Sequence, residues 1–165
     1  MDYDDFFRRV YPSLFRYLHR LTGDEDSAED IAQESFVRLL RQRLPEQEAR
    51  PWLFTVAMNL LRDSARKTAR RERLLVGAPV APSAAPAPDV LTERREAVDG
   101  VRAALAQLPE RDRRLLLMRE EGFSYNEIAG VIGVAPGSVG TLLARALRRF
   151  SAVYRMHEVE EDAHQ

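Results

Sequence analysis

The sequence predicts an all-α protein in which two small helical domains are joined by a linker, and three observations support this prediction. Apolar residues recur at steps of three and four over most of the chain, which is the spacing of amphipathic helices. Residues 76–92 are rich in proline and alanine, a composition that stays extended and forms no core. A length of 165 residues with a hydrophobic content of 45% is enough for a core in each of two small domains.

The composition excludes several classes of protein. Because the chain has no cysteine, it can form neither disulfides nor thiolate metal sites. No apolar run approaches the length of a membrane span, and the acidic residues 1–5 are unlike the start of a signal peptide. We therefore expect a cytoplasmic protein, and we predict no metal and no cofactor.

The formal net charge of −1 conceals a strong segregation of charge. Residues 1–40 hold nine acids against five arginines, and residues 62–73 hold six bases against two acids. A protein that binds DNA unaided is usually basic. An acidic region beside separate basic ones therefore indicates a chain that holds a protein partner and nucleic acid together.

The first predicted helix has an apolar stripe at helical spacing, made of Phe7, Val10, Leu14, Leu18 and Leu21. Pro12 removes one backbone hydrogen bond, so we expect it to bend or divide this helix. Gly23 ends the helix, and Asp24 or Asp26 caps the next one.

The second predicted helix covers residues 28–40 and carries acids near its start, where the helix dipole favours them. Ile31, Ser35 and Leu39 can face the core, which leaves another face for Asp30, Gln33, Glu34 and Val37. The acids are spaced wrongly for a calcium loop, and no histidine or second carboxylate cluster is at hand for acid–base catalysis. They indicate helix capping and a solvated or partner-facing surface.

Residues 41–51 are polar and contain two prolines, so we expect a connection there and a third helix over residues 52–71. The first half of that helix has an apolar stripe through Trp52, Val56 and Leu60, which predicts packing into the first domain. The second half is basic at steps of three and four, a spacing that can follow a phosphate backbone. A charged, solvent-exposed helix end is the alternative interpretation.

The second domain is predicted to begin with a helix through Leu91, Val98, Val101, Leu105 and Leu108. Pro109 starts the next helix, and Gly122 ends it. The expected domains are residues 1–75 and 93–155, with the linker at 76–92 and a frayed acidic tail at 156–165.

Residues 122–150 have the pattern of a helix-turn-helix. Ser124 and Glu127 form a capping box that predicts a helix from residue 125. Gly133 suits the left-handed turn that follows, and Pro136 suits the first position of the second helix. That helix is basic, with no acid between residues 134 and 156, which favours DNA binding over a solvated αα-hairpin.

Four motifs, in this order, resemble those of the extracytoplasmic-function (ECF) sigma factors of bacterial RNA polymerase. They are Ala-Glu-Asp-Ile-Ala-Gln-Glu-Ser-Phe at residues 28–36, Trp-Leu-Phe-Thr-Val-Ala-Met-Asn-Leu-Leu-Arg-Asp at 52–63, Leu-Pro-Glu-Arg-Asp-Arg at 108–113, and the helix-turn-helix at 122–150. The resemblance implies a sigma region 2 bundle followed by a sigma region 4 helix-turn-helix. It also implies a subunit without catalytic activity that directs promoter recognition, DNA melting and transcription initiation.

The resemblance further implies which residues touch each partner. The clamp helices of the largest polymerase subunit would bind Asp30, Gln33, Glu34 and Phe36. The minus-ten element and nearby phosphates would be held by Arg50, Asn59, Arg62, Arg66, Lys67, Arg70 and Arg71. The minus-thirty-five duplex would be contacted by Pro136, Gly137, Ser138, Gly140, Thr141, Arg145, Arg148 and Arg149. The second domain would also pack on the polymerase flap, and whether an anti-sigma factor sequesters the chain is left open.

Two departures from the family pattern fall in the recognition helix. Gly140 and Leu142 stand where many members carry lysine or arginine, and Ala135 replaces the usual serine or threonine cap. The best-placed donors to bases are then Ser138, Thr141 and Arg145. Trp52 has two interpretations, as part of the core or as a platform for an unpaired base.

Other classes of protein account for fewer of these features. A stand-alone helix-turn-helix regulator would leave the acidic helix and the linker unexplained. An enzyme would need a nucleophile beside a base, whereas His19, His157 and His164 are scattered along the chain. A bundle that only binds proteins would not crosslink to DNA, even with polymerase present.

Overall fold

The computed structural model describes residues 1–75 and 92–163, and every secondary-structure element in these ranges is an α-helix. In chain order the helices are α1 (Tyr3–Thr22), α2 (Glu25–Leu39), α3 (Glu46–Leu74), α4 (Thr92–Gln107), α5 (Glu110–Glu120), α6 (Tyr125–Ile132) and α7 (Pro136–Asp162). The prediction of an all-α fold is confirmed for these ranges. The predicted linker at 76–92 lies outside the described residues, apart from Thr92, which begins α4.

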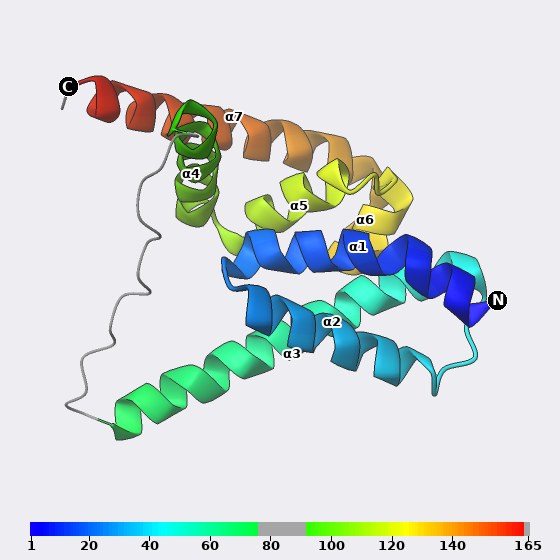
Figure 1. The fold of residues 1–165 in the computed structure, drawn as a ribbon. Coiled ribbons are helices and arrows are strands. Elements are labelled where there is room, and N and C mark those ends of the chain that lie inside the picture. The colour runs from blue at the N-terminus through cyan, green and yellow to red at the C-terminus, as the bar shows by residue number, and fades with distance from the viewer. Residues whose placement is uncertain (76–91, 164–165) are drawn as a thin grey trace.

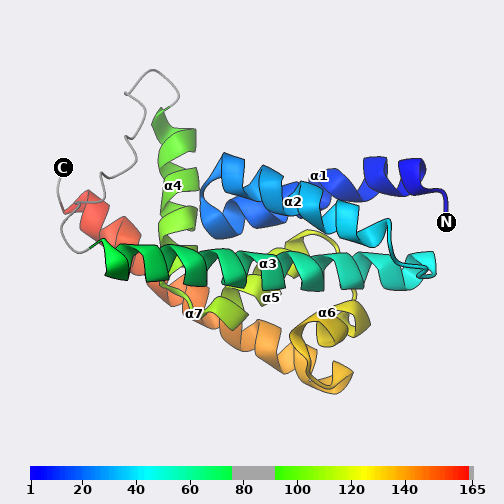
Figure 2. The same ribbon diagram turned by 90° about the horizontal axis from the view of Figure 1, so that it is seen from below.

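The helices form two units that pack against each other (Figure 1). In the first unit α1, α2 and α3 contact one another, and in the second unit α7 contacts α4, α5 and α6. Between the units, α3 contacts α6 and α1 contacts α5. In Figure 2, α3 runs between α1 and α2 on one side and α5, α6 and α7 on the other. The buried apolar residues of both units accordingly form one continuous cluster.

The first helix is not divided as expected, because α1 continues through Pro12 as a single helix of 20 residues. Its buried stripe contains Phe6, Val10, Leu14, Tyr17 and Leu18. Burial of a large apolar side chain contributes about 1.5–3 kcal/mol, so this stripe outweighs the one hydrogen bond that proline removes.

The third helix begins earlier than predicted, at Glu46 rather than at residue 52, so the connection after α2 is only residues 40–45. Pro51 lies near the start of α3, where it removes one hydrogen bond without ending the helix. The predicted stripe through Trp52, Val56 and Leu60 is only half-buried. The deepest side chains of α3 are Leu53, Phe54, Ala57 and Met58, because α3 packs on α1 and α2 and also on α6.

The helix-turn-helix forms as the sequence predicts. The Ser124 side chain accepts a bond from the backbone N–H of Glu127, and the Glu127 carboxylate accepts one from the N–H of Ser124. Gly133 has a φ of 80° and ends α6, and Pro136 begins α7. The bend between α6 and α7 is 88°. Within the described ranges, no single helix is long and apolar enough to cross a membrane.

The acidic tail is mostly helical rather than frayed, and α7 continues to Asp162. The reason is an extended contact with α4. The ring of Tyr154 packs over Gly100 of α4, where an added Cβ would lie 3.5 Å from it. Nearby, the side-chain nitrogen of Gln107 lies 2.6 Å from Nε2 of His157.

We predict that Ser124→Ala lowers the free energy of unfolding by about 1 kcal/mol, because it removes the N-cap of α6. Urea denaturation followed by circular dichroism measures this change. Ser64→Ala is the matched control, since Ser64 is exposed within α3 and should change stability by less than about 0.5 kcal/mol. Equal effects of the two substitutions would show that the capping box contributes nothing.

Candidate functional site

The acidic face of α2 consists of Asp30, Gln33, Glu34 and Val37, and all four are exposed. They point outward because the alternate face of α2, through Ala28, Ile31, Ala32, Ser35 and Leu39, is buried. Gln33 donates to Glu29 at 3.0 Å, and Glu34 accepts from Arg38 at 2.8 Å. Val37 is 47% exposed and the adjacent Leu40 is 61% exposed. The face thus combines carboxylates with exposed apolar surface, a composition suited to a protein partner.

Phe36 does not belong to this face, which corrects the expectation that it touches a partner. It is 2% exposed, and its ring centroid lies between 4.8 and 6.3 Å from those of four rings on α1. These rings belong to Tyr3, Phe6, Phe7 and Tyr11. Phe36 therefore fixes α2 against α1 and only positions the acidic face.

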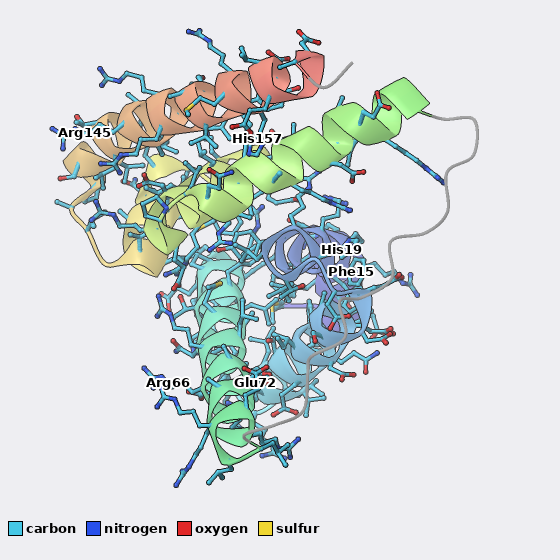
Figure 3. All side chains as sticks on the ribbon, turned by 90° about the vertical axis from the view of Figure 1, so that its left-hand side faces the viewer. Phe15, His19, Arg66, Glu72, Arg145 and His157 are labelled. Carbon is cyan, nitrogen blue, oxygen red and sulfur yellow. The ribbon has the colours of Figure 1, made fainter. Side chains whose placement is uncertain are left out.

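The basic end of α3 consists of Arg62, Arg66, Lys67, Arg70 and Arg71, all of them exposed. The last buried residue of α3 is Met58, so the helix extends beyond the first unit into solvent. Asn59 is exposed at the start of this segment. Figure 3 shows Arg66 pointing away from the blue helices α1 and α2. This arrangement is compatible with both interpretations drawn from the sequence, a phosphate-binding surface and a solvated helix end.

Two of the arginines predicted to bind DNA, Arg50 and Arg62, contact the second unit. Arg50 lies at the start of α3, where its guanidinium donates to the carbonyl of Glu121 at 2.5 Å and lies 4.0 Å from the ring centroid of Phe123. Burial lowers the pKa of Arg50, and the charges of Glu127 and Glu121 act in the opposite direction. Arg62 donates to the carboxylate of Glu110 at 3.0 Å.

The exposed face of α7 lies in the first half of the helix. It contains Pro136, Gly137, Ser138, Thr141, Arg145 and Arg148. Ser138, Thr141 and Arg145 share one side of the helix, since residues three and four apart are neighbours. Figure 3 shows Arg145 at the outer end of the molecule. The first turn of α7 contains no acidic residue. The face is therefore positive and exposed.

Gly140 lies on the other side of α7, which differs from the expectation that it contacts DNA. A Cβ added at Gly140 would lie 3.5 Å from the ring of Tyr125 in α6. Together with Leu143, Ala144 and Leu147 it lines a groove rather than the Ser138–Arg145 side. The absence of a basic side chain at this position therefore removes nothing from the positive face.

Arg149 is engaged within the second unit. Its Nη1 lies 2.5 Å from Oδ2 of Asp112, a residue that is only 2% exposed. A buried carboxylate needs a partner, because desolvation disfavours an unpaired charge. Arg149, itself 55% exposed, therefore fixes α7 against α5, whereas Arg148 donates only to the carbonyl of Ala144 in its own helix.

An apolar groove of about 1070 Å³ lies between α4, α5 and α7. Its walls include Val98, Val101, Leu105, Leu116 and Leu147. Arg20, Arg102 and Arg119 also line the groove, with Glu120 as the one acid among its lining residues. Val98 and Val101, which the sequence predicts as core, are 46% and 38% exposed and contribute to this groove.

The sequence does not point to Phe123, which lies at the centre of the contact between the units, or to Glu121, which lies at its edge. One signal was available for Glu121, because a carboxylate at the C-terminal end of a helix has the wrong sign for the helix dipole. Phe123 directly precedes the N-cap of α6. A hydrophobic residue at that position commonly packs on its own helix, so the sequence gives no reason to expect a contact with the first unit. Trp52 is half-buried against the core. In residues 1–75 and 92–163 no group of His, Asp and Glu has a metal-binding arrangement.

Comparison with known proteins assigns both units. Residues 6–71 match the family model "Sigma-70 region 2", and residues 99–150 match "Sigma-70, region 4". The ECF RNA polymerase sigma factor SigL of Mycobacterium tuberculosis is 37% identical over 145 residues, covering 82% of this chain and 78% of SigL. EcfG of Rhodopseudomonas palustris is 32% identical over 162 residues, covering 96% of this chain and 87% of EcfG. The chain spans 63% of the longer SigE of Mycolicibacterium smegmatis, at 28% identity.

A solved structure has the same fold. It is the sigma factor RpoE of Bartonella quintana in complex with the anti-sigma factor NepR. RpoE matches 93% of this chain and 97% of its own, with a TM-score of 0.70 and 23% sequence identity. Likeness at this identity supports the fold and the relative order of the helices.

We predict that Arg149→Ala lowers the free energy of unfolding by about 1–2 kcal/mol, because it leaves the buried Asp112 carboxylate without its cation. Arg148→Ala removes the same charge from the adjacent exposed position and should change stability by less than about 0.5 kcal/mol. Thermal and urea unfolding of the two variants measure the difference. A loss of stability in Arg148→Ala as large as that in Arg149→Ala would refute the positioning role of Arg149.

Proposed function

The chain belongs to the ECF sigma factors, and we propose that three surfaces divide its work between core RNA polymerase and promoter DNA. As a sigma factor it directs RNA polymerase to promoters and supports transcription initiation, and it is a specificity subunit rather than an enzyme. The three surfaces are the acidic face of α2, the basic end of α3 and the exposed face of α7. Their separation on three different helices is the observation that carries the proposal.

The acidic face of α2 binds the clamp helices of the largest polymerase subunit. Asp30, Gln33 and Glu34 are exposed on one side of α2, with Val37 and Leu40 beside them. Carboxylates complement a basic partner, and the exposed apolar side chains provide area that gains by being covered. Because the whole chain has a net charge of −1, it gains little from counterion release, so polymerase supplies much of the affinity for a promoter.

The basic end of α3 holds the minus-ten element. Arg66, Lys67, Arg70 and Arg71 are exposed at helical spacing and can follow the phosphates of one strand. Asn59 and Arg62 precede these residues in α3, next to its packed first half, where they are suited to the fork between duplex and open strands. Unstacking a base costs a few kcal/mol, which contacts to the separated strand can offset.

The exposed face of α7 reads the minus-thirty-five element in the major groove. Ser138, Thr141 and Arg145 are suited to base edges, and Arg148 to a backbone phosphate. Arg149 holds α7 in place through Asp112, so we assign it a positioning role instead of a base contact. The preceding α6 crosses the backbone, as the first helix of a helix-turn-helix does.

The apolar groove between α4, α5 and α7 is the surface we propose for the polymerase flap. Its apolar walls suit the apolar side of a helix, and its three arginines favour acids at the edge of that helix. RpoE of Bartonella quintana was solved in complex with the anti-sigma factor NepR, and CnrH in complex with the cytosolic domain of CnrY. An anti-sigma factor that covers this groove would compete with polymerase. The chain would act in the cytoplasm, and the anti-sigma factor would hold it inactive there.

Run-off transcription tests the function as a whole. Core polymerase with and without this chain is supplied with a library of genomic fragments, and transcripts that require the chain identify its promoters. Transcripts that are the same with and without the chain would contradict the proposal.

We predict that the triple variant Asp30→Ala, Gln33→Ala, Glu34→Ala weakens binding to core polymerase by about tenfold or more, as expected for loss of a central contact. Biolayer interferometry with immobilised core enzyme measures the dissociation constant. The control is Asp4→Ala combined with Glu96→Ala, which also removes two exposed acids. Equal affinity of the triple variant and the wild type would remove α2 from the polymerase interface.

We predict that Arg145→Ala weakens promoter binding by the holoenzyme about 10- to 100-fold when the minus-thirty-five element is intact. Arg155→Ala is the matched control, because Arg155 is an exposed arginine about 15 Å further along α7. Electrophoretic mobility shift with the intact and a scrambled minus-thirty-five element measures the effect. An equal loss on both DNAs would show that Arg145 reads no bases there.

A further inference from the structure

We propose that a row of stacked rings on α1 completes the polymerase-binding surface by taking a cationic side chain of the clamp helices. This ring ladder consists of Phe7, Tyr11, Phe15 and His19. The cation lies against the ring of Tyr11 and pairs with the carboxylate of Glu29 on α2. The inference rests on the proposed role of the acidic face of α2, and it adds the chemistry by which that surface selects its partner.

The ring ladder is a regular feature of α1. Its members are four residues apart, so they project from one side of the helix. Successive ring centroids lie 4.9, 6.4 and 5.8 Å apart, with angles of 30°, 13° and 25° between the ring planes. All four side chains are half-buried, so each ring keeps part of its surface in solvent. Figure 3 shows Phe15 and His19 next to each other on α1.

Packing between α1 and α2 explains only part of the ring ladder. The ring centroid of Phe36 lies 4.8 Å from that of Phe7 and 5.9 Å from that of Tyr11. Within the described part of the chain, the ring contacts of Phe15 are with Tyr11 and His19 alone. The outer sides of the rings form a contiguous apolar strip, and such strips commonly mark an interaction site.

Gln33 joins the ring ladder to the acidic face of α2. Its side chain donates to Glu29 at 3.0 Å. Burial and the charge of Glu29 raise the pKa of Tyr11, and hydrogen bonding to Gln33 acts in the opposite direction. Both α2 residues therefore lie beside the Tyr11 hydroxyl. Because Gln33 is also a member of the acidic face, the two features form one continuous surface that crosses from α1 to α2.

The charge beside the ring ladder is negative. Residues 24–39 hold six carboxylates against one arginine, Arg38, which pairs with Glu34. In residues 1–75 and 92–163, arginines lie over the rings of Phe54, Phe123 and Tyr125, and none lies over a ring of the ladder. The ladder thus offers ring surface beside carboxylates to a cation from another protein.

An arginine or lysine side chain suits both parts of this surface. The face of an aromatic ring is negative and attracts a cation, and a nearby carboxylate adds direct attraction between opposite charges. An arginine can stack on a ring while its N–H groups donate to a carboxylate. Carboxylates alone accept many basic segments, whereas a ring in a fixed position favours a partner whose cation lies over it. The ring ladder therefore adds selectivity to the acidic face.

The test changes the charge on the ring face at Tyr11 and keeps the size of the side chain. Tyr11→Phe keeps the ring and removes only the hydroxyl, whereas Tyr11→Leu keeps an apolar side chain and removes the ring. Phenylalanines of increasing fluorination at position 11 keep the ring and withdraw negative charge from its face. Biolayer interferometry of each full-length variant on immobilised core polymerase measures the dissociation constant, and urea denaturation checks that each variant is folded.

The expected result is that Tyr11→Leu weakens binding to core polymerase about three- to tenfold, as for the loss of a cation–π contact. Tyr11→Phe should bind about as tightly as the wild type, and affinity should fall stepwise with fluorination. Equal affinities of Tyr11→Leu and Tyr11→Phe overturn the proposal. Fluorinated variants that all bind like Tyr11→Phe overturn it as well, because the contact would then be apolar only.

A double-mutant cycle tests whether Glu29 holds the same cation. If it does, Tyr11→Leu and Glu29→Gln together should weaken binding by less than the product of their separate effects. Glu34→Gln is the matched control, since Glu34 pairs with Arg38 and its effect should multiply with that of Tyr11→Leu. Effects of Tyr11→Leu and Glu29→Gln that also multiply overturn the shared site.

Failure of this inference can be told from failure of the proposed function. If the triple variant Asp30→Ala, Gln33→Ala, Glu34→Ala binds core polymerase weakly and the Tyr11 series does not change affinity, only the ring ladder is removed from the interface. If the triple variant binds like the wild type, the proposed role of α2 fails, and the inference that rests on it fails too.

Discussion

The packing of Phe123 between Phe54 and Arg50 decides how the two units are arranged. Phe123 sits in the turn that ends α5 and begins α6, so its ring is fixed by the same turn that starts the helix-turn-helix. With its centroid 4.5 Å from that of Phe54, this ring extends the apolar core of the first unit into the second. The ion pairs of Glu121 and Glu110 surround this contact, and their partners Arg16 and Arg62 are 52% and 45% exposed. Apolar burial therefore supplies the main attraction, and the charges select the register.

Segregation of charge explains how a chain with a net charge of −1 can serve both a protein and DNA. The acids of α2 and the bases of α3 lie on separate helices, so neither surface neutralises the other. In the arrangement described here, the acids that meet Arg50 and Arg62 come from the second unit. The same rule of opposite charge thus governs both contact with a partner and contact between the units.

Three sides of α7 have three different tasks. Val139 and Ala146 are buried against α5 and α6, and they position the helix. Arg145 lies on the exposed positive side, while Gly140 and Leu147 line the apolar groove. A helix of 3.6 residues per turn presents such sides next to one another, so one element contributes to a core, an exposed positive face and an apolar groove.

Features that depend on near neighbours in the chain can be predicted from the sequence alone. The capping box at Ser124, the left-handed Gly133 and the start of α7 at Pro136 arise from bonds within a few residues, so local chemistry is sufficient to predict them. The region 2 and region 4 assignments follow from motifs of the same kind. The acidic and basic surfaces were also predictable, because charge clusters are visible in the sequence.

Which side chains are covered depends on the packing of segments that are far apart in the chain. Phe36 follows the acidic residues in the motif but is buried among the rings of α1, and Gly140 lies in the recognition helix but faces Tyr125. Arg50 is basic, yet it contacts Phe123, a residue more than seventy positions away in the chain. Exposure depends on which distant segments pack together, and that choice is made by burial of the whole apolar core rather than by any local pattern.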